Sequence, residues 1–147
     1  DVYKRQAIAV CAGVGYYYSR PERTAQKVLT AVYTADEAEI QKRREAIDNK
    51  TFDAYIRGLC GDAVTDNCID GMITASPLYY GATPAKVESI KFSPIDKATS
   101  DTASFQYTAV FSDDSDVKER IGHVVMKKEN GKWRVNSFGT KSITRAD

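Results

Sequence analysis

The sequence predicts an α+β fold, in which helices from the first half of the chain pack on one face of a curved, mostly antiparallel sheet from the second half. Two observations support this class. Apolar residues recur at helical spacing from about residue 21 to residue 75. From about residue 86 apolar and polar residues alternate, which is typical of strands with one buried face.

The first predicted helix begins at Pro21, because proline is tolerated in the first helical turn. Its apolar residues fall on one face: Ala25, Val28, Leu29, Val32 and Tyr33. Thr34 and Glu37 have the spacing of a capping box, so a second helix is predicted to start there. That stretch is highly charged, which indicates a solvated helix rather than a binding surface.

Two shorter helices are expected next. Thr51 is the predicted N-cap of the third helix, and Gly58 and Gly61 mark its end. The apolar positions of this helix are Phe52, Tyr55, Ile56 and Leu59. The fourth helix is expected from about residue 65 to residue 75.

The strands follow in the second half. Ile90 and Phe92 alternate in the first strand, with Val87 out of phase, which predicts a bulge or a later start. The clearest strand runs from Ala103 to Phe111.

A polar turn is predicted at residues 112–116, and residues 121–128 and 133–138 then flank Asn130-Gly131, the strongest short signal for a hairpin. The acidic residues of the polar turn lack the glycine and the distal glutamate of a calcium loop, so a solvated turn is expected.

The composition of the chain argues against several classes of function. The 147-residue chain has the length of one domain and a formal net charge of +1 at pH 7. A near-neutral chain without a basic block argues against nucleic acid as a partner. The single histidine cannot build a His-rich zinc site, and no phosphate loop or dinucleotide fingerprint occurs. We therefore expect neither a metal nor a cofactor.

Residues 1–18 differ from the rest. Residues 1–6 resemble a translated sequencing adapter, so we expect a fragment from environmental sequencing and exclude them from the fold. Residues 7–18 form an uncharged run that predicts a truncated membrane anchor or signal segment. The alternatives are a buried strand or core helix, a lipoprotein signal with Cys11 as the lipidated residue, or a cleaved signal peptide. The domain is then expected over residues 19–147.

Two segments resemble the NTF2-like superfamily, which has the cystatin-like fold: Leu29 to Asp36 and Lys128 to Val135. The resemblance spans about Pro21 to Ile143. Within the superfamily the chain is similar to small, membrane-anchored extracytoplasmic members of Gram-positive bacteria, and similar domains occur in conjugation-machinery subunits. The resemblance implies a conical arrangement that encloses a cavity, and a homodimer through the sheet as a common assembly.

The candidates for lining that cavity are mainly aromatic: Tyr33, Tyr55, Tyr79, Tyr107, Trp133 and His123. In members that resemble ketosteroid isomerase, a carboxylate base and a tyrosine donor converge in the cavity. Tyr33 or Tyr55 with Asp36 or Asp53 is the pairing that this sequence offers. The plainer interpretation is core aromatics and acids at helix starts, where an acidic residue favours the helix dipole.

The hairpin turn decides which face of its strand His123 occupies. If the turn contains a bulge, His123 shares a face with Trp133 and Val135. If the turn is a simple two-residue loop, it shares a face with Asn136 and Phe138. A structural role is favoured, because a general base needs a suitable partner within hydrogen-bond reach.

Cys60 and Cys68 flank a short loop in the helical half. Outside the cytoplasm such a pair is predicted to form a disulfide that joins two helix ends. The alternatives are two free, partly buried thiols or a metal pair. The spacing argues against a metal, because it is not Cys-x-x-Cys and no second pair exists.

These observations favour a non-catalytic, membrane-tethered module outside the cytoplasm that binds a protein partner or a small apolar ligand. The basis is the anchor-like run, the predicted disulfide and the lack of a catalytic constellation. Two alternatives stay open. One is an assembly subunit of a conjugation or secretion apparatus, and the other is a cavity enzyme of the ketosteroid-isomerase type.

Overall fold

Four α-helices precede a four-stranded sheet in the computed structural model, which describes residues 20–75 and 82–145 and confirms the α+β class. The helices are α2 (Pro21–Tyr33), α3 (Glu37–Asp48), α4 (Phe52–Cys60) and α5 (Asp66–Ala75), with a 3-10 helix η1 (Gly61–Ala63) before α5. The strands are β1 (Val87–Pro94), β2 (Thr102–Phe111), β3 (Val117–Glu129) and β4 (Lys132–Arg145). The predicted adapter, the predicted anchor and Tyr79 lie outside the described residues.

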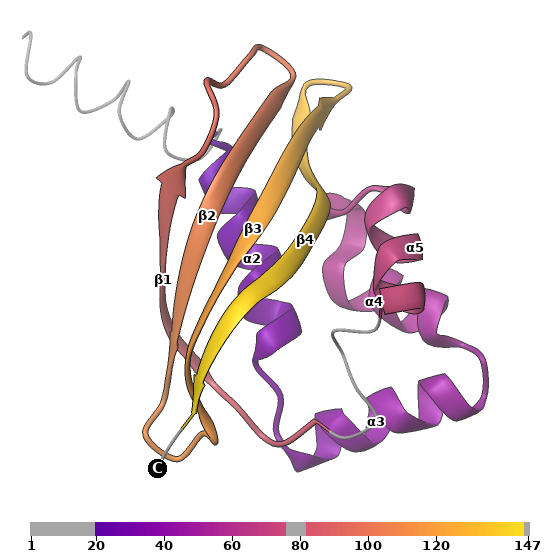
Figure 1. Cartoon of the computed structure of the whole chain (residues 1–147). Coiled ribbons are helices and arrows are strands. Elements are labelled where there is room, and N and C mark those ends of the chain that lie inside the picture. Colours follow the sequence, from indigo (N-terminus) through magenta and orange to yellow (C-terminus); the bar gives the residue numbers. More distant parts are fainter. Residues whose placement is uncertain (1–19, 76–81, 146–147) are drawn as a thin grey trace, which may run out of the picture.

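The strands form an antiparallel meander in the order β1-β2-β3-β4. Figure 1 shows the helices on one side of this sheet, with α2 directly behind it and α4 and α5 beside β4. All five apolar residues predicted for one face of α2 are buried. They pack with inward side chains of the sheet such as Tyr107, Val124 and Val135. Each large apolar side chain buried there contributes about 1.5–3 kcal/mol to stability.

Asp36, and not Thr34, begins α3. The Asp36 carboxylate accepts a hydrogen bond from the backbone nitrogen of Glu39 at 2.8 Å, which is the N-cap contact of this helix. The Thr34 hydroxyl instead accepts from the backbone nitrogen of Val87 at 3.2 Å. The predicted capping box of Thr34 and Glu37 is therefore wrong, because a contact to β1 uses the threonine side chain.

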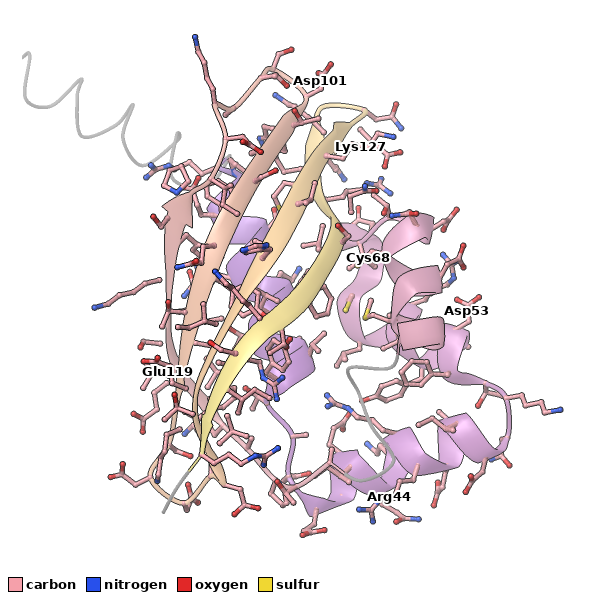
Figure 2. All side chains as sticks on the ribbon, viewed as in Figure 1. Arg44, Asp53, Cys68, Asp101, Glu119 and Lys127 are labelled. Atoms are coloured by element: carbon pink, nitrogen blue, oxygen red, sulfur yellow. The ribbon has the colours of Figure 1, made fainter. Side chains whose placement is uncertain are left out.

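The ends of the next helices follow the sequence more closely. Gly61 ends α4 with a φ of +60°, which glycine adopts without strain, whereas Gly58 lies within that helix. The Thr65 hydroxyl accepts from the backbone nitrogen of Cys68 at 3.1 Å at the start of α5. Figure 2 shows Asp53 on the outer side of this helical layer and Cys68 on the side that faces the sheet.

Asn130 and Gly131 form the predicted turn between β3 and β4, with φ angles of +53° and +77°. Two left-handed residues are what a type I′ turn requires. Beyond this simple turn the register shifts, because Met126 pairs with Val135 whereas the preceding residue pairs with Ser137. The extra residue between them is a bulge in β4, and a second predicted bulge is confirmed in β1 at Val87.

This bulge decides which β4 residues share a face with His123. His123 pairs with Gly139 and is exposed, whereas Val135 is buried and Phe138 packs against the core. Neither predicted arrangement of His123 occurs, because the hairpin combines a two-residue turn with a bulge further along β4, so Val135 and Phe138 both face inward. His123 therefore lies on the face of the sheet that points away from the helices.

Gly122 makes room for the side chain of Tyr107, its cross-strand neighbour on the inner face. A Cβ atom at Gly122 would overlap the carbonyl oxygen of Gly139 and would lie 2.5 Å from the Tyr107 hydroxyl oxygen. The missing side chain lets this hydroxyl donate to the Gly139 carbonyl oxygen at 2.9 Å.

Replacement of Gly122 by alanine is expected to lower the free energy of unfolding by about 1–3 kcal/mol, because the new methyl group displaces Tyr107 or the β4 backbone. Gly139→Ala is the matched control, since a Cβ atom there meets nothing within 4 Å. Urea denaturation of both variants measures the difference. Equal stability of the two variants would contradict this role for Gly122.

Candidate functional site

A cavity of about 190 Å³ lies where the end of α2 and the start of α3 approach one end of the sheet. Its apolar wall is formed by Val32, Tyr33, Ile40, Phe111, Val117 and Ile143. Its charged lining residues are Arg43, Arg120, Arg145 and Asp116. We call this cavity the Arg120 pocket. An apolar wall with a few polar groups is the usual composition of a small-molecule site.

Tyr33 lines the pocket, and its hydroxyl belongs to a chain of hydrogen bonds in the core behind it. The hydroxyl oxygens of Tyr33 and Tyr107 are 3.0 Å apart. Because Tyr107 donates its proton to the Gly139 carbonyl, Tyr33 is the donor in the bond between the two tyrosines. Burial, followed by the neighbouring Tyr33, raises the pKa of Tyr107 well above its usual value. Two of the four predicted cavity tyrosines, Tyr33 and Tyr107, are therefore brought together.

Arg120 lies on the inner face of β3, opposite the buried Ala109. Its Nη1 donates to the Thr140 hydroxyl at 2.9 Å, and its guanidinium carbon lies 4.7 Å from the centre of the Tyr33 ring. Its Nε is buried and has no hydrogen-bond partner among residues 20–75 and 82–145. The guanidinium is thus held in place while part of its donor capacity is unused.

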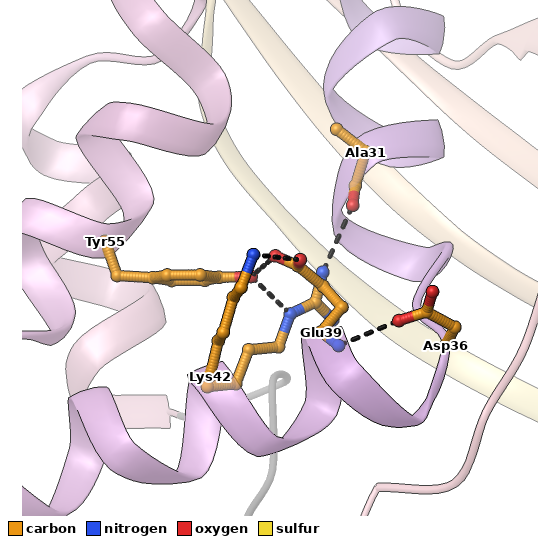
Figure 3. A network of polar contacts seen from close by, with 6 residues as sticks. Ala31, Asp36, Glu39, Lys42 and Tyr55 are labelled. Atoms are coloured by element: carbon orange, nitrogen blue, oxygen red, sulfur yellow. Dashed lines mark hydrogen bonds and ion pairs between the residues drawn. The ribbon is translucent and has the colours of Figure 1, made fainter.

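Arg43 is the second arginine at the pocket, and it is almost fully buried at 4% exposure. Its Nη1 and Nη2 donate to the carbonyl oxygens of Val32 and Ala31 at 2.8 and 3.2 Å. Its Nε donates to the Tyr55 hydroxyl at 2.8 Å, and Tyr55 in turn donates to the Glu39 carboxylate (Figure 3). Burial and then the bond to Glu39 raise the pKa of Tyr55 to about 12.

Neither of these two arginines was among the residues predicted from the sequence. Arg43 lies in a charged stretch whose composition predicts a solvated helix. Only its position one turn after the buried Ile40 indicates that its side chain points inward. Arg120 is followed by Ile121, so hydrophobic alternation alone favours the wrong face. Counting back by two from the buried Met126 and Val124 places Arg120 inward.

The other predicted residues lie elsewhere. Tyr55 belongs to the Arg43 network, and His123 is on the outer face of the sheet. Trp133 is half-buried near the Asn130-Gly131 turn, with the Lys128 Nζ 5.7 Å from its ring centre. Among the predicted cavity residues in the described part of the chain, Tyr33 alone lines the pocket, with Tyr107 bonded behind it.

The carboxylates proposed for a tyrosine–acid pair also have other partners. Asp36 caps α3, and Asp53 is exposed and forms an ion pair with Arg57 at 2.6 Å. The part-buried tyrosine–carboxylate contact in the described residues joins Tyr55 to Glu39 instead. This contact links α3 to α4, since Glu39 lies on α3 and Tyr55 on α4.

A larger groove of about 630 Å³ lies beside the Arg120 pocket and is more open. Three of its polar side chains already have partners within the protein. Glu39 accepts from Tyr55, Asp114 accepts from the Ser112 hydroxyl, and Ser115 contacts both Ser112 and the Lys86 nitrogen. The groove is thus a wider and more open site than the Arg120 pocket, with several of its polar groups already bonded.

The predicted disulfide is not present, because Cys60 and Cys68 are both free thiols. Each side chain is buried in the apolar core, where a cysteine behaves as a small apolar residue. Burial raises the pKa of the Cys60 thiol to about 11 and that of the Cys68 thiol to about 12. Thiols that stay protonated are poor nucleophiles at neutral pH.

The chain matches no protein-family model and no curated protein. In the part of the chain that the structure describes, no helix is both long and apolar enough to cross a membrane. The NTF2-like assignment therefore rests on the sequence resemblance alone.

Replacement of Arg43 by methionine is expected to lower the free energy of unfolding by at least about 2 kcal/mol, because two carbonyl groups at the end of α2 and the Tyr55 hydroxyl lose a donor. Lys42→Met removes a charge from an exposed neighbour and should change stability by about 0.5 kcal/mol or less. Thermal unfolding followed by circular dichroism compares them. If Arg43→Met leaves the stability unchanged, the network does not stabilise the fold.

Iodoacetamide should label Cys60 and Cys68 slowly in the native protein near pH 8, and completely in urea without a reducing agent. Labelling of the native protein is slow because both thiols are buried and their pKa values are raised, and it is complete in urea because both are reduced. Peptide mapping by mass spectrometry separates these two cysteines from Cys11. A cross-linked peptide that contains Cys60 and Cys68 would contradict the free-thiol state.

Proposed function

We propose that the chain is a non-catalytic binding module of the NTF2-like fold, and that it holds a small ligand in the Arg120 pocket. The observation that carries this proposal is the state of Arg120. This cation faces an apolar cavity at the rim of the core, and within residues 20–75 and 82–145 it forms no ion pair. A fixed and incompletely partnered cation in an apolar pocket favours ligand recognition.

Binding is favoured over catalysis by the state of Tyr33, which lines the pocket, and of Tyr107 behind it. Tyr33 donates to Tyr107, and Tyr107 donates to a backbone carbonyl, so neither proton is directed at a ligand. The raised pKa of Tyr107 also makes it a poor acid near neutral pH. The cavity-enzyme alternative requires a carboxylate beside one of these hydroxyl groups.

The remaining parts of the predicted function concern residues 7–18 and partner proteins. A membrane tether and a location outside the cytoplasm stay predictions from the sequence. The same holds for a protein partner, a homodimer through the sheet, and a subunit role in a conjugation or secretion apparatus. The small-ligand proposal is preferred because the Arg120 pocket gives it a defined site.

Three monocyclic probes of similar size test the proposal: benzoate, benzyl alcohol and benzylamine. At least one should bind with a Kd below about 10 mM, measured by shifts in the amide NMR spectrum. Ile143→Trp should abolish that binding, because Ile143 lines the pocket and is 39% exposed at its rim.

Ile95→Trp is the matched control, because Ile95 is also an exposed isoleucine but does not line the pocket. It should bind the probes as the unmodified protein does. If none of the three probes binds, or if the two tryptophan variants bind them equally well, the proposal of a small-ligand site here fails.

A further inference from the structure

We infer that the ligand of the Arg120 pocket is a small carboxylate with an apolar body, and that Arg120 receives the carboxylate group. This inference rests on the proposed function and names its ligand class. Three features carry it: the charge balance of the pocket, the way in which Arg120 is held, and the size and polarity of the remaining wall.

The charge balance is positive. Three arginines and one aspartate line the pocket. The Arg43 guanidinium is committed to two backbone carbonyls and to Tyr55. Among the described residues neither Arg120 nor Arg145 forms an ion pair with Asp116 or with another acid. With Arg43 committed, the charges of Arg120, Arg145 and Asp116 leave the pocket a net charge of +1, which attracts an anionic ligand.

Arg120 is held for recognition before a ligand arrives. Thr140 fixes one terminal nitrogen at 2.9 Å, and the Tyr33 ring lies beneath the guanidinium. The Nε–H lacks a partner although it is buried, which is an unfavourable state for a donor. The terminal N–H groups that Thr140 does not occupy remain for a carboxylate, whose two oxygens match two parallel guanidinium donors.

The rest of the wall selects for a small apolar body. Phe111, Val117 and Ile143 leave about 190 Å³ between the helices and the sheet. This volume is below the roughly 300–1,000 Å³ of pockets that hold drug-sized ligands. A short aliphatic or single-ring carboxylate fits such a space. Inorganic sulfate carries the charge but has no apolar part to cover these side chains.

The test compares benzoate, benzyl alcohol and sulfate on the full chain in a low-chloride buffer. Benzoate should bind at least about tenfold more tightly than the neutral benzyl alcohol and than sulfate, and its affinity should fall as salt is added. The side-chain Nε–H signal of Arg120 should shift on addition of benzoate. These comparisons use the unmodified protein and do not depend on the folding of a variant.

Arg120→Gln should reduce benzoate affinity about tenfold or more and leave benzyl alcohol affinity within about twofold. Arg134→Gln is the matched control. Arg134 is half-buried on the same sheet and its Nε also has no partner among the described residues, but it does not line the pocket. This control should bind benzoate as the unmodified protein does.

The possible failures are distinguishable. If benzyl alcohol binds as tightly as benzoate and Ile143→Trp abolishes both, the ligand site stands and the carboxylate inference is wrong. Sulfate that binds as tightly as benzoate, or equal losses in Arg120→Gln and Arg134→Gln, would also overturn the inference. If no probe binds, both the proposed function and the inference fail.

Discussion

The buried guanidinium of Arg43 satisfies the carboxyl end of α2, and the arrangement of the helices depends on it. The last carbonyl groups of a helix have no partner within it, and α2 has no basic residue in its own last turn. Arg43 brings both the missing donors and the positive charge from α3. Its third contact reaches Tyr55 on α4, so one side chain connects three helices. A buried charge is tolerated here because each nitrogen has an acceptor.

The same contact reaches the Arg120 pocket through Tyr33, the last residue of α2. Tyr33 touches Arg120 with its ring and Tyr107 with its hydroxyl. Tyr107 can reach this point only because Gly122 leaves space between the strands. The position of Arg120 thus follows from packing on both sides. Arg43 fixes the helix that supplies the ring beneath Arg120, and the strands fix the backbone that carries it.

Periodic features were predictable from the sequence, and exceptions to the period were not. The apolar face of α2, the alternation in β2 and the Asn130-Gly131 turn each follow from short-range spacing. The bulge in β4 adds one residue without any glycine or proline to mark it, and it places Val135 and Phe138 together on the inner face, away from His123. Arg43 and Arg120 were missed because their burial depends on partners distant in sequence, such as Thr140. The free cysteines show that spacing alone does not determine a disulfide.

The protonation states of the groups around the Arg120 pocket favour ligand binding over acid–base catalysis. An arginine stays charged at all physiological pH values, and the raised pKa of Tyr107 keeps its hydroxyl protonated over the same range. General acid–base catalysis works best with a group that titrates near the working pH. The fixed charge and fixed donors at this site are instead suited to holding an anion in one orientation. The electrostatics therefore favour recognition of a ligand over its chemical conversion, and they do so independently of the NTF2-like resemblance.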